Sequence, residues 1–274
     1  MEKVLNKTKA LGMIIAALVV FLLISGAVGF GYGIYIGLTH RGISSGELEV
    51  LLQSNGIYIT GIADLILIVI FGIWYKKGFA TSKSGMSVNP VKKILLSVIF
   101  GLSAGIGLAV MVTLIHFEAM NIKFLDPKYI SYNSSDSYSL LRGNIIIQIL
   151  VVAIIAPICE ELVFRGVLYG YLKRIFGVII SVILVSIMFG LVHMNIEQGV
   201  FAFLFSLCLL FAYEKFTTIW APILMHVFNN LYSVLATYYG FEEKYINTQT
   251  LVFVEMFVAL IVAIVSGYFI SKKK

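Results

Sequence analysis

The sequence is poor in charged residues. Asp, Glu, Lys and Arg make up only 12% of its 274 residues, whereas soluble domains carry ~25%. Hydrophobic residues account for 60%, so a water-soluble fold would have too few charged groups to cover its surface. This excess of apolar side chains requires lipid as the solvent. Because backbone groups in lipid must pair within their own segment, we predict an all-α polytopic membrane protein.

Other features are also scarce, and each absence argues against a class of protein. The two cysteines, Cys159 and Cys208, lie in apolar runs, which argues against a disulfide framework. The HExxH motif of zinc proteases and the G-x-S-x-G motif of serine hydrolases do not occur. The net charge of +6 does not indicate a nucleic-acid partner, because the basic residues lie beside apolar runs, as topology signals do.

Long apolar runs take the place of charge. A membrane span needs ~20 predominantly apolar residues, and we predict a bundle of about eight transmembrane helices forming a single integral membrane domain, residues 1–274. If the N-terminus lies inside, 15 of the 20 Lys and Arg residues lie on the inner side and 5 on the outer side. This bias predicts that both termini are cytoplasmic. The predicted spans are approximately 11–38, 57–75, 92–117, 144–164, 175–193, 197–213, 219–238 and 249–271.

Ionisable side chains inside such spans are energetically unfavourable, so each is a candidate functional residue. Glu160 and Glu161 follow Pro157 near the end of the fourth span. Neighbours in a helix differ by ~100° in direction, so the two carboxylates cannot serve one point equally. Glu161 and Arg165 are four residues apart on one face and can pair, which would leave Glu160 free to face a cavity. The alternative is a cluster of charges at the lipid boundary.

Two later spans add neutral polar groups. His193 ends the fifth span in the pattern Phe189-x-x-x-His193, and His226 and Asn230 lie one turn apart on the seventh. A carboxylate base, two histidines and an amide suffice to hydrolyse a peptide bond, because the base can deprotonate water while the donors stabilise the oxyanion. The alternatives are a structural His193 and, for the His226–Asn230 pair, hydrogen bonds that hold helices together.

Three motifs therefore follow one another along the chain, namely Glu160-Glu161-x-x-x-Arg165, Phe189-x-x-x-His193 and His226-x-x-x-Asn230. In this order they resemble the CPBP family of CAAX-type prenyl endopeptidases and bacteriocin-processing enzymes, also called the Abi family. The resemblance covers residues 144–238. It implies an intramembrane endopeptidase that hydrolyses peptide bonds of membrane-associated peptides or proteins, with a catalytic cavity opening from the membrane.

The resemblance also implies roles for these residues. Glu160 would activate water with help from His193, while His226 and Asn230 would form the oxyanion site and the Glu161–Arg165 pair would hold the geometry. No cofactor is expected, because a glutamate-dependent mechanism without metal fits the family. Members are also labelled metalloproteases, and zinc, if used, would be bound by Glu160, His193 and His226.

Two other functions remain open from the sequence. A non-catalytic bacteriocin-immunity or scaffold membrane protein would use the polar cluster to bind a partner, and a transporter would use it to line a pathway. We expect a multi-pass protein of the cell membrane, from a bacterium, whose partners are the lipid bilayer and a membrane peptide or protein substrate. The substrate, its cut site and the oligomeric state are left open by these motifs.

Overall fold

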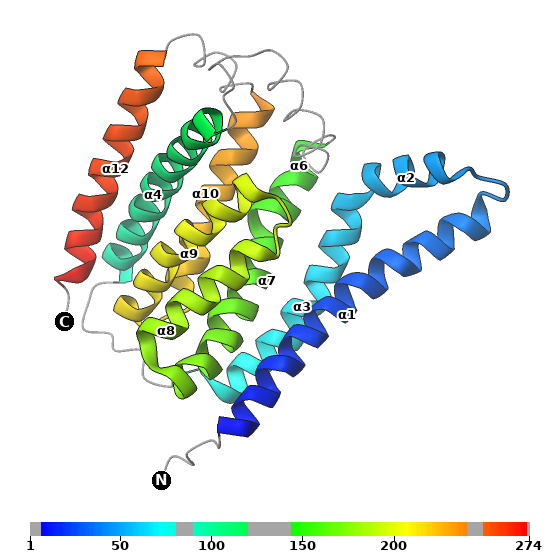
Figure 1. Ribbon diagram of the computed structural model, residues 1–274, viewed down its shortest axis with the longest axis horizontal. Coiled ribbons are helices and arrows are strands. Elements are labelled where there is room, and N and C mark those ends of the chain that lie inside the picture. The colour runs from blue at the N-terminus through cyan, green and yellow to red at the C-terminus, as the bar shows by residue number, and fades with distance from the viewer. Residues whose placement is uncertain (1–6, 81–89, 120–143, 240–248, 273–274) are drawn as a thin grey trace.

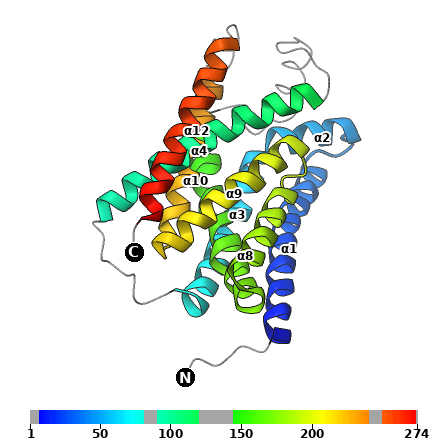
Figure 2. The same cartoon turned by 60° about the vertical axis from the view of Figure 1, so that its left-hand side comes forward.

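A computed structural model describes residues 7–80, 90–119, 144–239 and 249–272, and its regular elements in these ranges are all helices. The helices form a bundle in which α1 begins and α12 ends toward the same end (Figures 1 and 2). In chain order they are α1 Lys7–Thr39, α2 Ser45–Ser54, α3 Gly56–Gly78, α4 Pro90–Ala119, α6 Ile145–Gln148, η2 Ile149–Ile155, α7 Ala156–Glu161, η3 Leu162–Leu168, α8 Tyr169–Leu191, α9 Ile196–Phe216, α10 Trp220–Tyr238 and α12 Gln249–Ser271.

The predicted membrane bundle is confirmed. Six helical stretches of the described chain are long and apolar enough to cross a bilayer, and one of them, Ile145–Leu191, is 47 residues long and divides in two at Gly177. α10 is not among the six because His226, Asn229 and Asn230 reduce its apolar character. Its 19 residues still make ~28 Å of helix, and it packs against α4, η2 and α9. With α10 and the division at Gly177, the described residues contain the eight expected segments.

The chain reverses direction at Gly177. Its φ of 76° and ψ of −176° are not helical, and a positive φ suits glycine because glycine has no Cβ. Arg165 and Phe189 lie on either side of this break, yet the guanidinium carbon is 4.4 Å from the centre of the phenyl ring. In one straight helix they would be ~36 Å apart. The predicted end of the fourth span at residue 164 is therefore too early, because that helix continues to Gly177.

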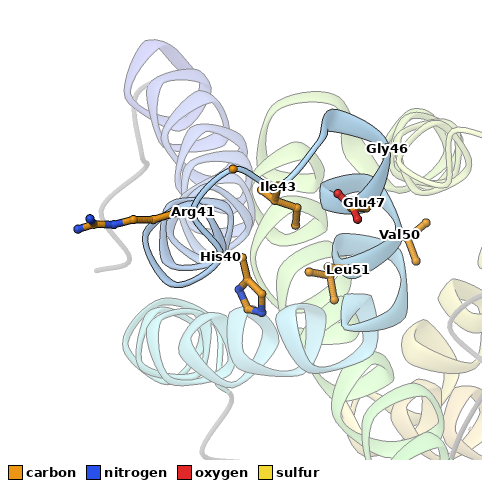
Figure 3. A pocket seen from close by; sticks show the side chains of 8 residues that line it. His40, Arg41, Ile43, Gly46, Glu47, Val50 and Leu51 are labelled. Atoms are coloured by element: carbon orange, nitrogen blue, oxygen red, sulfur yellow. The ribbon is translucent and has the colours of Figure 1, made fainter.

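α2 is an additional short helix that the search for membrane-length runs did not predict. Its N-terminus carries a capping box, in which the backbone N–H of Glu47 donates to Ser44 Oγ and the backbone N–H of Ser44 donates to Glu47 Oε2. A surface pocket beside this turn is lined by His40, Arg41 and Leu51, among others (Figure 3). None of the candidate site residues lines that pocket.

Two hydrophobic clusters pack the bundle. The first surrounds η3, whose seven residues are all buried, and includes side chains of α1, α3 and α8. The second joins α4, α9, α10 and α12. α9 belongs to both, since Leu210 packs in the first and Leu209 in the second. The polar site lies where helices of the two clusters meet.

α4 approaches α10 closely through glycines of its GxxxG pattern. A Cβ added at Gly101 would lie 2.7 Å from the Cα of Met225, and one added at Gly105 would lie 1.8 Å from Asn229 Oδ1. Small residues allow such backbone contact between membrane helices. α4 therefore packs directly against α10, the helix that carries His226.

Candidate active site

The segment that carries the carboxylates contains two π-helical stretches, η2 and η3, on either side of α7. In π geometry a carbonyl accepts from the N–H five residues later, as Val151 O does from Ala156 N. The next carbonyl, of Val152, would pair with residue 157, which is proline and has no N–H. Asn230 of α10 supplies a donor instead, because its Nδ2 donates to Val152 O at 3.0 Å. Pro157 thus explains why this carbonyl is open to α10.

Glu161 and Arg165 form the ion pair that their spacing predicts. Arg165 Nη1 donates to Glu161 Oε1 at 2.9 Å, and neither side chain has exposed surface. The same carboxylate oxygen accepts from His226 Nδ1, also at 2.9 Å, a contact that the sequence pattern does not predict. Buried charges need such additional hydrogen bonds, because their removal from water is strongly unfavourable. The pair therefore orients the His226 ring.

Glu160 has a different environment from its neighbour Glu161. Its side chain is 26% exposed, and its Oε2 lies 3.7 Å from His226 Nε2, beyond hydrogen-bond distance. That oxygen has no hydrogen-bond partner among the described residues. Oε2 of Glu161 also has no partner among the described residues, so the two glutamates differ through Glu161 Oε1, which binds both Arg165 and His226.

His193 lies in the turn after α8, two residues beyond Leu191, rather than within the helix. Its Nδ1 lies 2.8 Å from Phe189 O, and since a carbonyl can only accept, Nδ1 carries the hydrogen in this contact. Nε2 is then the unprotonated nitrogen of the neutral ring. The turn is tight, because a Cβ at Gly190 would lie 2.7 Å from the carbonyl oxygen of Gly199 on α9.

The Phe189 ring lies at the centre of the three motifs. It is 1% exposed, and the Arg165 guanidinium lies over it in a cation–π contact. His193 and His226 both meet the ring in edge geometry, with centroid distances of 5.1 and 5.8 Å. Phe189 thus contacts both histidines and the arginine.

Three polar side chains near the site were missed as parts of it. Ser206 of α9 accepts from Arg165 Nη2 at 2.7 Å, and Asn229 Nδ2 lies 3.4 Å from Asn230 Oδ1. Asp64 of α3 has the Cys159 thiol as a hydrogen-bonding neighbour. The sequence held no signal for Ser206, while the adjacent asparagines could have drawn attention to Asn229.

The residues named for zinc do not form a ligand set in this structure. Among the described residues no group of three or more His, Cys, Asp or Glu side chains could share one metal ion. His226 uses Nδ1 to contact Glu161, and His193 uses Nδ1 to contact a backbone carbonyl. Both contacts are hydrogen bonds of the kind that orient an imidazole ring for proton transfer.

Comparison with known proteins finds a similarity over the part of the chain that carries this cluster. A family model described as type II CAAX prenyl endopeptidase Rce1-like matches residues 142–232. That range contains all six candidate site residues. Residues 142–232 are therefore similar to the CAAX-type prenyl endopeptidases over about a third of the chain. The matched range includes α6 through most of α10, so α1, α3, α4 and α12 lie outside it.

The chain is also similar to the Bacillus subtilis (strain 168) protein named "Putative membrane peptidase YdiL". It is 28% identical over 89 residues, which are 32% of this chain and 36% of that protein. The chain thus matches about a third of the relative's length. No solved structure matches the chain.

Proposed function

We propose that this protein is an intramembrane endopeptidase that hydrolyses peptide bonds of membrane-associated peptides or proteins. The observation that carries the proposal is the unequal use of two adjacent glutamates. Glu161 is fully buried and is bound through Oε1 by Arg165 and His226, whereas the Glu160 side chain is 26% exposed and its Oε2 lies 3.7 Å from His226 Nε2. In a membrane bundle similar to a protease family, such a partly exposed carboxylate is suited to act on water.

In the proposed reaction Glu160 takes a proton from water, and the resulting hydroxide attacks the carbonyl carbon of the scissile peptide bond. His193 assists through Nε2, the nitrogen left unprotonated by the contact of Nδ1 with Phe189 O. Collapse of the tetrahedral intermediate breaks the C–N bond, and the proton held by Glu160 passes to the leaving amine.

His226 and Asn230 would stabilise the oxyanion, and the contacts set a condition on His226. Its Nδ1 hydrogen is used by Glu161, so Nε2 can donate to an oxyanion only when the ring is doubly protonated. The Glu161 carboxylate, at 2.9 Å, would stabilise that positive charge. Asn230 uses one amide hydrogen on Val152 O and has a second for substrate.

The test compares cleavage by purified full-length protein in detergent micelles. The probes are quenched fluorogenic peptides, both farnesylated CAAX peptides and a library of lipid-anchored peptides. Glu160→Gln removes the base and should lower kcat by ~10²–10⁴. Glu255→Gln is the matched control, because Glu255 of α12 is hydrogen-bonded by Tyr232 and lies outside the site.

Equal cleavage by the wild type and Glu160→Gln would contradict the mechanism. Absence of cleavage, together with bacteriocin immunity or solute transport that survives in Glu160→Gln, would favour the immunity or transporter function instead.

Metal dependence is tested separately. We propose that catalysis needs no cofactor, so dialysis against EDTA should leave kcat unchanged. Loss of bound zinc together with loss of activity, and recovery of both on adding zinc, would show that the metal-free mechanism is wrong and that the protein is a metalloprotease.

We also propose a bacterial cell-membrane location with both termini in the cytoplasm, in support of which α1 begins and α12 ends toward the same end of the bundle (Figure 1). Reporter fusions at each terminus test it. A periplasmic signal from either fusion would contradict the orientation.

A further inference from the structure

We propose that Ser206 is a positioning residue of the active site, acting through Arg165 and Glu161 on His226. The proposal rests on the proposed function for its catalytic consequence. Its structural basis is a chain of contacts that crosses three packed helical segments. Ser206 Oγ accepts from Arg165 Nη2 at 2.7 Å, Arg165 Nη1 donates to Glu161 at 2.9 Å, and Glu161 accepts from His226 Nδ1 at 2.9 Å.

Ser206 differs from the usual serine of a membrane helix. Ser97, Ser103, Ser181 and Ser266 are also in helices, and each donates to the carbonyl four residues earlier, which is the common local arrangement. The hydroxyl of Ser206 instead faces another helix and contacts a charged group. The Ser206 hydroxyl thus bonds a cation on another helix, whereas the other four hydroxyls bond the backbone of their own helix.

Arg165 needs this contact because it is fully buried. Its guanidinium has Glu161 on Nη1, Ser206 on Nη2 and the Phe189 ring at its face, while Nε has no partner among the described residues. Without Ser206, Nη2 would lose a short hydrogen bond and the guanidinium could turn within its site. Glu161 would turn with it, and the ring of His226 would lose its fixed orientation.

The chain offers a matched control in Ser186 of α8. Ser186 and Ser206 both have no exposed surface, and the Ser186 hydroxyl has no hydrogen-bond partner among the described residues. Ser186→Ala therefore removes a buried hydroxyl of equal size without touching the network. Ser206→Thr keeps the hydroxyl and serves as the conservative rescue.

The experiment measures kcat and KM for peptide cleavage, and the melting temperature in detergent, for each variant. We expect Ser206→Ala to lower kcat on the order of tenfold with little change in KM, and Ser206→Thr to recover most of this loss. Ser186→Ala should behave like the wild type. In an Arg165→Lys background, where the single amine cannot reproduce both guanidinium contacts, Ser206→Ala should have little further effect on kcat or melting temperature.

Equal kcat for Ser206→Ala and Ser186→Ala, or full additivity with Arg165→Lys, would overturn the inference. A wild type that cleaves no peptide would overturn the proposed function alone. The coupling between Ser206 and Arg165 would then still be decided by melting temperatures, where additive shifts count against it and non-additive shifts support it.

Discussion

α1 and α4 look alike in sequence, yet their glycines have different surroundings. Both helices are long, apolar and rich in glycine. A Cβ added at Gly29 or Gly33 of α1 would meet nothing within 4 Å, whereas one at Gly101 or Gly105 of α4 would collide with α10. α4 is thus part of the support of the site although it lies outside the matched residues 142–232. The glycines of α1, in contrast, have no neighbouring helix within contact distance of an added Cβ.

Two ion pairs show the same contrast between interior and surface. Glu161–Arg165 and Lys173–Glu214 have similar distances, 2.9 and 2.6 Å, but the first pair has no exposed side-chain surface while the second is 41% and 27% exposed. Distance alone therefore does not rank the two pairs by the stability lost when one partner is removed. That loss depends on burial, because an unpaired charge is more unfavourable inside the protein than at its surface. The following predictions test these comparisons.

The largest effect is expected from breaking the buried pair. Arg165→Met should lower the free energy of unfolding by ~3–5 kcal/mol, because Glu161 would remain charged and buried without its cationic partner, with only the contact to His226 left. Lys173→Met, the surface counterpart, should change it by less than ~1 kcal/mol. Unfolding in mixed detergent micelles measures both. Similar losses for the two variants would show that burial does not separate the pairs.

Replacing Gly101 or Gly105 of α4 with alanine should have different effects. Gly101→Ala meets the backbone of Met225, so α4 and α10 must move apart, and stability should fall by ~1–3 kcal/mol. Gly105→Ala meets the side-chain oxygen of Asn229, which can rotate away from Asn230, so we expect a loss of kcat larger than the loss of stability. Melting temperature and cleavage rate, measured on the same preparations, check this order, and unchanged values for both variants would contradict the close packing.

Asn230 has a structural and a proposed chemical role that can be separated. Asn230→Ala leaves Val152 O without its donor, which should destabilise the protein by ~1–3 kcal/mol. Adding Pro157→Ala restores an N–H at residue 157 that can serve the same carbonyl. We expect the double variant to recover stability but not kcat. Recovery of kcat as well would show that Asn230 acts through Val152 alone.

The smallest effect is expected on α1. Gly29→Ala and Gly33→Ala add a methyl group to open space and replace glycine with a better helix former, so stability should stay within ~1 kcal/mol of the wild type or rise slightly. A loss as large as that of Gly101→Ala would mean that this face packs against another helix in the membrane, and would remove the contrast between α1 and α4.

Local spacing was enough to predict a large part of the site. The i, i+4 separation of Glu161 and Arg165 predicted their pairing and left Glu160 available, because a helix places such residues on one face regardless of the rest of the chain. Apolar runs likewise predicted the eight helical segments, since lipid requires each span to satisfy its own backbone. These features are local, so the sequence alone determines them.

Contacts between helices were decided only by the tertiary structure. The hydrogen bond from His226 to Glu161, the contact of Ser206 with Arg165 and the approach of Gly105 to Asn229 join residues 41 to 124 positions apart. No periodicity encodes which faces of two apolar helices meet. The reversal at Gly177 is the clearest example, because one positive φ brings Phe189 back onto Arg165 and so assembles two motifs that an unbroken helix would have kept apart.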